Sequence, residues 1–271
     1  MRNALLLALA ACTGLLATSP TLAGEPPKPL SNAHAHNDYE HGRPLLDALD
    51  AGFCSVEADI YLIDGRILVA HDRDKVKPER TLQNLYLDPL KEKVALHGGS
   101  VHPGATPPPF SLLIDLKSEG ETTYIALHEV LAGYADMLTK FEDGHVRQGA
   151  VNVIISGNRP LEMMKNQKLR FAGFDGRLAD LEGREPASFM PWISDNFRSH
   201  FKWSGEGEMP AEDQKKLADI VKRTHNAGKK LRLWAAPDVP SCWKALNKAG
   251  VDVINTDKLT ELRTFLLEES P

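Results

Sequence analysis

The feature that most constrains the fold is a regular alternation of strand-like and helix-like segments along most of the chain. The strand-like segments, rich in β-branched and other apolar residues, are 30–36, 54–63, 110–118, 150–158, 169–175, 190–196, 231–237 and 251–257. Helix-like segments, such as 122–138 and 210–230, lie between them. Roughly eight strands alternating with helices in about 250 residues predict an α/β fold, the single-domain (β/α)8 TIM barrel. A doubly wound open sheet is the alternative, but a glycine-rich phosphate loop is missing after the first strand.

The first 23 residues are expected to lie outside this domain. Arg2 is the only charge before Glu25, residues 4–17 are mostly apolar, and residues 21–23 offer small side chains for a signal peptidase. We therefore expect a signal peptide at 1–23, a barrel domain at 24–271 and a secreted or periplasmic protein without a stable membrane anchor after cleavage. A lipoprotein signal ending at Cys12 is the alternative.

Charge and cysteine content narrow the function classes. The formal net charge of −5 argues against a nucleic-acid partner and against strong binding to anionic lipid surfaces. Downstream of the predicted signal the chain has two cysteines, Cys54 and Cys242. One begins a predicted strand and the other begins a predicted helix, at opposite ends of a barrel, which favours two buried thiols over a disulfide.

The strand at 54–63 places carboxylates inside the barrel. Residues 56, 58 and 60 are apolar and share one face, whereas Ser55, Glu57 and Asp59 share the other. The apolar face suits packing against helices. The polar face then points inward, with its carboxylates towards the C-terminal end, where barrel enzymes carry their catalytic groups.

Polar side chains recur at the ends of three successive strands, so one patch is predicted. These residues are His34, His36, Asn37 and Asp38, then Glu57 and Asp59 with His71 and Asp72 on a hairpin return, then Asp115 and Lys117. Carboxylate and amide oxygens suit a hard divalent cation, Ca²⁺ or Mg²⁺, better than Zn²⁺. Histidines beside such a cation suit general acid–base catalysis, and Lys117 suits an anionic oxygen. The patch therefore predicts chemistry at a phosphodiester.

Two other interpretations compete with this one. The His34-x-His36 pair is also typical of metal-dependent amidohydrolases, with Asp257 as a last-strand ligand, although the middle strands supply no histidine. A barrel of the same fold that only binds a sugar or a lipid headgroup is the non-enzymatic alternative.

Several motifs resemble the phospholipase C-like and glycerophosphodiester phosphodiesterase superfamily. "VEADIYLIDGRILVAHD" is similar to its Glu-x-Asp strand, Asp-Gly turn and His-Asp return, and "IDLK" to its acidic-x-Lys strand. "HNDYEHGRPLLDALDAGFCSVEADIYL", "RTLQNLYLDPL", "ISGNRP" and "INTDKL" resemble a branch named for altered inheritance of mitochondria. The similarity runs from about residue 32 to the end.

The resemblance implies a role for each matching residue. His36 and His71 match the catalytic histidines. Glu57, Asp59, Asp115 and Asn37 match metal ligands, and Lys117 matches a phosphate-side lysine. The chain departs from the glycerophosphodiesterases at Asn37, where they carry an arginine, and at Asp115, where glutamate is usual. The implied substrate is a small-molecule or lipid-headgroup phosphodiester.

Weaker candidates for substrate contact follow later strands. Asn158 and Arg159 follow the segment at 150–158, and Trp234 ends a later strand. The long segment 194–210, with its aromatic residues, is expected either to cover the site or to pack down on the barrel.

Overall fold

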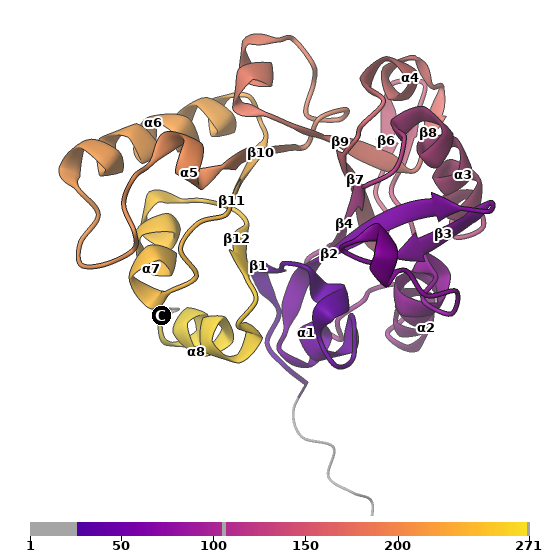
Figure 1. Cartoon of the computed structure of the whole chain (residues 1–271), viewed down its shortest axis with the longest axis horizontal. Helices are drawn as coiled ribbons and strands as arrows, with labels where there is room; N and C mark the ends of the chain where they lie inside the picture. The colour runs from indigo at the N-terminus through magenta and orange to yellow at the C-terminus, as the bar shows by residue number, and fades with distance from the viewer. Residues whose placement is uncertain (1–25, 105–106, 270–271) are drawn as a thin grey trace, which may run out of the picture.

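The computed structural model describes residues 26–104 and 107–269. In this part of the chain, eight parallel strands form a ring with helices around its outside (Figure 1). The strands are β1 (Leu30–Ala35), β2 (Phe53–Ile63), β4 (Phe110–Leu116), β7 (Val151–Gly157), β9 (Ala172–Gly176), β10 (Trp192–Asn196), β11 (Lys230–Trp234) and β12 (Ile254–Thr256). The predicted (β/α)8 barrel is confirmed.

The ring closes between the first and the last strands. Strand β1 pairs in parallel with both β2 and β12. A parallel bridge between Arg232 and Val253 joins β11 to β12. The register places Asp59 of β2 opposite Asp115 of β4, so the two carboxylates lie side by side at the C-terminal mouth.

The helices cover the outer face of the barrel (Figure 1). They are α1 (Leu46–Asp50), α2 (Asp88–Leu96), α3 (Gly120–Ala132), α4 (Leu161–Asn166), α5 (Phe197–His200), α6 (Ala211–Asn226), α7 (Pro240–Ala249) and α8 (Leu259–Glu269), with short helical turns η1 (Asp38–Glu40), η2 (Arg73–Lys75), η3 (Gln83–Leu87) and η4 (Leu178–Glu182). In α6 the buried residues Leu217, Ile220, Val221 and Thr224 follow the helical period and face the barrel. Pro89 is the second residue of α2, which follows the helical turn η3 without a break.

Two apolar clusters separate the outside of the barrel from its inside. Val56, Ala58 and Ile60 belong to the large cluster between strands and helices. Leu113, Ile154, Trp192 and Val253 form a second, smaller cluster. Glu57, on the opposite face of β2 from Val56, points into the barrel as the alternation predicts.

A small antiparallel sheet departs from the predicted pattern. Strands β5 (Lys140–Glu142), β6 (His145–Arg147) and β8 (Leu169–Arg170) form it. The predicted strand at 169–175 was wrong as a single element, because its first two residues pair with β5 and only Ala172–Gly176 enter the barrel. The Arg170 guanidinium lies 4.7 Å above the Phe141 ring and adds a contact between β8 and β5. The predicted hairpin return is β3 (Arg66–Val69), antiparallel to β2.

The segment 194–210 packs down on the barrel. Phe197 and Phe201 are buried against each other, with ring centroids 4.7 Å apart. The indole N–H of Trp203 donates to the Glu206 carbonyl oxygen. Of the two expectations for this segment, the packing of its aromatic residues is the one observed.

Cys54 and Cys242 are both buried free thiols, as predicted. Burial raises the pKa of each thiol to about 12, so both remain protonated at neutral pH. The predicted signal peptide at 1–23 and the lipidation alternative at Cys12 lie outside the described residues. Within residues 26–104 and 107–269, none of the helices has the length and hydrophobicity that a membrane crossing requires.

Candidate active site

Three carboxylates meet at the C-terminal mouth of the barrel. One oxygen from each of Glu57, Asp59 and Asp115 lies within 4.8 Å of the others. Glu57 and Asp59 are buried, and Asp115 is partly exposed. The convergence follows from the period of two within β2 and from the register between β2 and β4.

A glycine makes room for the third carboxylate. Gly157 ends β7 with φ +72°, and a Cβ at this position would overlap the Asp115 Oδ1 atom and the Leu116 backbone. Both the space and the left-handed backbone conformation therefore require glycine here.

Lys117 bridges two of the carboxylates. Its Nζ lies 3.0 Å from Asp59 Oδ2 and 3.2 Å from Asp115 Oδ1. Burial opposes its charge, but the two carboxylates outweigh burial and raise the pKa of Lys117 to about 12. Burial, together with the negative charge of Glu57, raises the pKa of Asp59 to about 6 despite the nearby ammonium.

Glu57 forms a buried ion pair with Arg232 of β11, which lies 175 positions later in the sequence. Arg232 Nη2 lies 2.6 Å from Glu57 Oε2, and the two side chains are only 4% and 7% exposed. Arg232 Nε donates to Asn255 Oδ1 at 3.0 Å. Burial disfavours the Glu57 charge, but Arg232 and His34 outweigh it and hold the pKa of Glu57 far below its usual value. Arg232 was not a candidate in the sequence, whereas Asn255 was one, as the polar end of a later strand. The available signal was the Leu-Arg-Leu alternation at 231–233, which places Arg232 on the inner face.

His36 lies beside the carboxylates and is held by a fourth acid. Its Nδ1 is 2.8 Å from Asp257 Oδ1, and its Nε2 is 4.0 Å from Glu57 Oε2. The Asp257 N–H in turn donates to Asp238 Oδ2. Burial lowers the pKa of His36, but the bond to Asp257 and the charge of Glu57 outweigh it, so the net pKa is raised. The imidazole is one third exposed and its Nε2 faces the site.

His34 lies in the interior of the barrel. It is fully buried, its Nδ1 is 2.7 Å from Ser55 Oγ, and its ring meets Trp192 edge-on. Its Nε2 lies 3.5 Å from Glu57 Oε2. Burial lowers the pKa of His34 to about 4, so the imidazole is neutral at pH 7.

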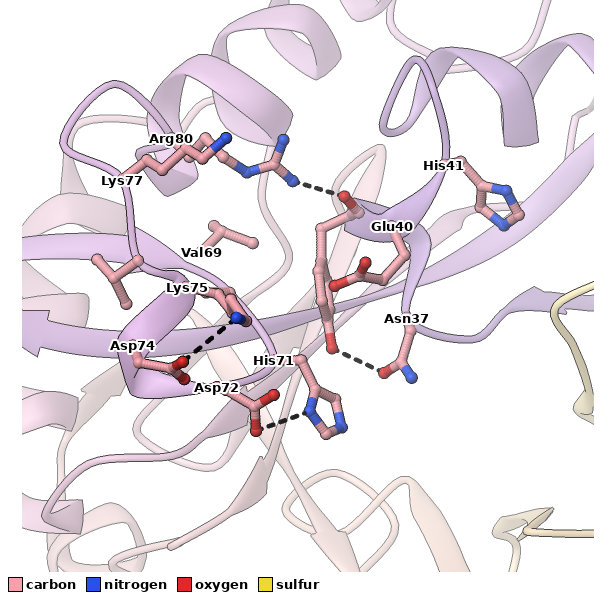
Figure 2. A pocket seen from close by; sticks show the side chains of 13 residues that line it. Asn37, Glu40, His41, Val69, His71, Asp72, Asp74, Lys75, Lys77 and Arg80 are labelled. Carbon is pink, nitrogen blue, oxygen red and sulfur yellow. Dashed lines mark hydrogen bonds and ion pairs between the residues drawn. The ribbon is translucent and has the colours of Figure 1, made fainter.

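His71 and Asn37 line one pocket beside the carboxylates, with a volume of about 730 Å³ (Figure 2). His71 follows β3, its side chain is about half exposed, and its Nδ1 lies 3.2 Å from Asp72 Oδ1. Asn37 has a left-handed backbone conformation, and its Oδ1 is 2.8 Å from the Tyr39 hydroxyl oxygen. That hydroxyl oxygen is also 2.7 Å from Asp59 Oδ2, so Tyr39 links the amide to the carboxylate cluster.

Asp38 anchors the loop that carries His36 and Asn37. Its buried Oδ2 accepts hydrogen bonds from the Leu45 N–H at 2.5 Å and the Tyr86 hydroxyl at 2.9 Å. Leu45 has φ +64°, an uncommon value for a residue with a side chain, and the bond to Asp38 holds it there. Burial raises the pKa of Asp38 to about 6.

The weaker substrate candidates have partners within the fold. Asn158 Nδ2 donates to the carbonyl oxygens of Lys117 and Ser118. The Arg159 guanidinium donates to the Asp175 carbonyl oxygen and lies 4.8 Å above the Phe174 ring. Trp234 is half-buried at the end of β11. The contacts of Asn158 and Arg159 hold strand ends together.

The donor set fits a hard divalent cation. Asp59 Oδ1 is buried and has no hydrogen-bond partner among the described residues. An unpaired buried carboxylate oxygen is costly unless a cation or a donor meets it. The Asp59 carboxylate, with Glu57, Asp115 and the Asn37 amide, supplies oxygen ligands. Oxygen ligands are those that Ca²⁺ and Mg²⁺ prefer.

Comparisons with known proteins place the sequence with one group. A family model described as "AIM6-like phosphodiesterase domain" matches residues 28–175. The chain is 27% identical over 264 residues to an altered inheritance of mitochondria protein 6 homolog of Arthroderma benhamiae, covering 86% of this chain and 82% of the relative. It is 29% identical over 267 residues to altered inheritance of mitochondria protein 6 of Saccharomyces cerevisiae, covering 83% and 68%. The span matched by the family model, 28–175, contains the three carboxylates and both candidate catalytic histidines. Arg232 and Asp257 lie beyond the part that this model matches.

Proposed function

The chain belongs to the AIM6-like phosphodiesterase domain family, and from this premise we propose that it is a metal-dependent phosphoric diester hydrolase acting on a small-molecule or lipid-headgroup phosphodiester. One observation carries the proposal: His36, oriented by Asp257, faces a cluster of three carboxylates at the catalytic mouth of a barrel.

His36 fits the role of general base. The bond from Nδ1 to Asp257 fixes the ring, which leaves Nε2 to accept a proton from the attacking water. His71, on the pocket wall, then fits the role of the general acid that gives its proton to the leaving oxygen. The atoms balance as water and diester are converted into a phosphate monoester and an alcohol.

The carboxylates and the cationic side chains of Lys117 and Arg232 determine the charge at the site. A divalent cation, Ca²⁺ or Mg²⁺, bound by Glu57, Asp59, Asp115 and Asn37 would neutralise charge on the phosphoryl oxygens. Lys117 holds Asp59 and Asp115 close together. Arg232 keeps Glu57 ionised and fixes its position.

Export is part of the proposal. The apolar segment and small residues before Gly24 support a cleaved signal peptide and a secreted or periplasmic enzyme. N-terminal sequencing of the protein recovered outside the cytoplasm tests this, and a chain recovered there with Met1 intact would contradict it.

Hydrolysis of bis(p-nitrophenyl) phosphate tests the enzymatic function. His36→Ala and His71→Ala should each lower kcat by about 10²- to 10⁴-fold, the usual contribution of one general acid or base. His34→Ala, two residues before His36 and at a buried position, is the control and should cost far less. Loss of activity in His34→Ala with retention in His71→Ala would instead favour the amidohydrolase-like alternative. No turnover in the wild type with any divalent cation would favour a barrel that only binds its ligand.

A further inference from the structure

The pocket beside the carboxylates is formed by two loops. One wall is the segment after β1, with Asn37, Glu40 and His41, and the other is the segment from the end of β3 to Arg80 (Figure 2). Its volume of about 730 Å³ lies in the range of sites for small molecules. It is therefore large enough for a polar group of a diester beyond the reacting phosphate.

The positions of the two histidines indicate on which side of the reacting phosphorus the pocket lies. His71 lines it, whereas His36 is absent from the described residues that do. In the proposed reaction the group beside the acid is the leaving alcohol, and the group beside the base is the water. The pocket is thus on the leaving side of the phosphorus.

The walls carry charges of both signs, and most of them are already paired. Asp74 pairs with Lys75, Asp72 meets His71, and Arg80 donates to the Tyr39 carbonyl oxygen.

Two charges are left over on opposite walls. Among the described residues that line the pocket, Glu40 and Lys77 are the charged side chains with neither a salt bridge nor a side-chain hydrogen bond, whereas Arg80 has its bond to Tyr39. Figure 2 shows that Glu40 comes from the loop after β1 and Lys77 from the opposite loop. Both side chains are exposed, so water solvates them in the free protein. An occupant that offers a positive group to Glu40 and a negative group to Lys77 is attracted by both walls, each by the small amount of an exposed ion pair, and a hydrocarbon chain is attracted by neither.

We propose that this pocket receives the leaving alcohol of the diester, and that this alcohol carries both an ammonium and a carboxylate group, as an amino-acid headgroup does. The inference rests on the proposed hydrolase function. The ammonium faces Glu40 and the carboxylate faces Lys77. In the reaction the bond from phosphorus to the alcohol oxygen breaks as the water oxygen bonds to phosphorus. His36 takes the proton from water, and His71 supplies the proton to the departing alcohol.

Three synthetic diesters that share an ethyl group test the proposal: ethyl phosphoserine, ethyl phosphoethanolamine and ethyl phosphoglycerol. The wild type should prefer the serine diester and should release serine and ethyl phosphate, which phosphorus NMR distinguishes from phosphoserine. Glu40→Gln should lower kcat/KM for the serine and ethanolamine diesters about 2- to 5-fold and leave the glycerol diester unchanged. Lys77→Met should lower it by a similar factor for the serine diester alone, since each exposed pair contributes little.

Matched controls come from exposed positions on α6. Glu212→Gln and Lys222→Met make the same changes far from the pocket and should alter none of the three rates. Equal effects of Glu40→Gln or Lys77→Met on all three diesters would overturn the inference, as would release of ethanol from the serine diester or a wild type without preference.

Hydrolysis of bis(p-nitrophenyl) phosphate distinguishes failure of this pocket assignment from failure of the proposed hydrolase function. A wild type that cleaves this probe but shows none of the charge selectivity refutes the pocket assignment alone. A wild type that cleaves neither the probe nor the diesters refutes both the proposed function and this inference.

Discussion

Removal of the Arg232 guanidinium should lower the free energy of unfolding far more than an ordinary surface substitution does. Arg232 and Glu57 are both almost fully buried, with 2.6 Å between the bonded atoms. Arg232→Met leaves the carboxylate without its cation, and breaking a buried pair in this way costs about 3–5 kcal/mol. The Asn255 side-chain oxygen also loses its donor, which adds to the cost.

A double-mutant cycle measures the coupling between the two side chains. Urea unfolding of Arg232→Met, Glu57→Met and the double variant gives three free energies of unfolding. The double variant should be more stable than Arg232→Met by at least about 2 kcal/mol, because it removes the unpaired charge along with its partner. Lys222→Met on exposed α6 is the control and should change the free energy by less than about 0.5 kcal/mol. A cost below about 1 kcal/mol for Arg232→Met, or additive single costs, would refute the reasoning.

Three further outcomes are expected. Gly157→Ala should displace the Asp115 carboxylate and strain the backbone, so the divalent-cation concentration for half-maximal activity should rise while a conservative Gly133→Ala leaves it unchanged. A chelator should abolish hydrolysis and Ca²⁺ or Mg²⁺ should restore it, with Ca²⁺ somewhat better, and Asp59→Asn should require more of either; full activity in a rigorously metal-free sample contradicts this. Burial lowers the pKa of His102 in the fold, so the neutral form is favoured there. The stability that neutral His102 contributes is complete above its unfolded pKa of about 6.5 and is lost as the pH falls towards the folded pKa. His102→Gln should therefore reduce the change in the urea midpoint between pH 7.5 and pH 5. An unchanged pH dependence of the midpoint contradicts the assignment.

The part of the site that depends on strand periodicity could be predicted from the sequence. Glu57 and Asp59 are two residues apart in a strand, and Asp115 ends the next barrel strand, so parallel pairing brings them to one mouth. The hairpin signal at Asp64-Gly65 also sufficed for β3. Local patterns carry this information because they fix which face a side chain occupies.

The rest depends on contacts between distant segments, which local patterns do not encode. Arg232 appears in the sequence as one polar residue between two leucines, and its partner Glu57 lies 175 positions earlier. Asp257 was weighed only as a metal ligand of the amidohydrolase alternative, whereas the structure bonds it to His36. The sheet formed by β5, β6 and β8 was missed although Asp143-Gly144 is a hairpin turn, because the strands on either side have only three residues each.

The closure of the barrel between β1 and β12 has a consequence for the order in which the chain is made. His36 and Glu57 leave the ribosome early, but their partners Asp257 and Arg232 leave it near the end of synthesis. A nascent chain that stops before residue 232 therefore contains His36, His71 and all three carboxylates, but it lacks the Asp257 partner of His36 and the Arg232 partner of Glu57. The observed arrangement around His36 and Glu57 is therefore complete only when the last strands join the first.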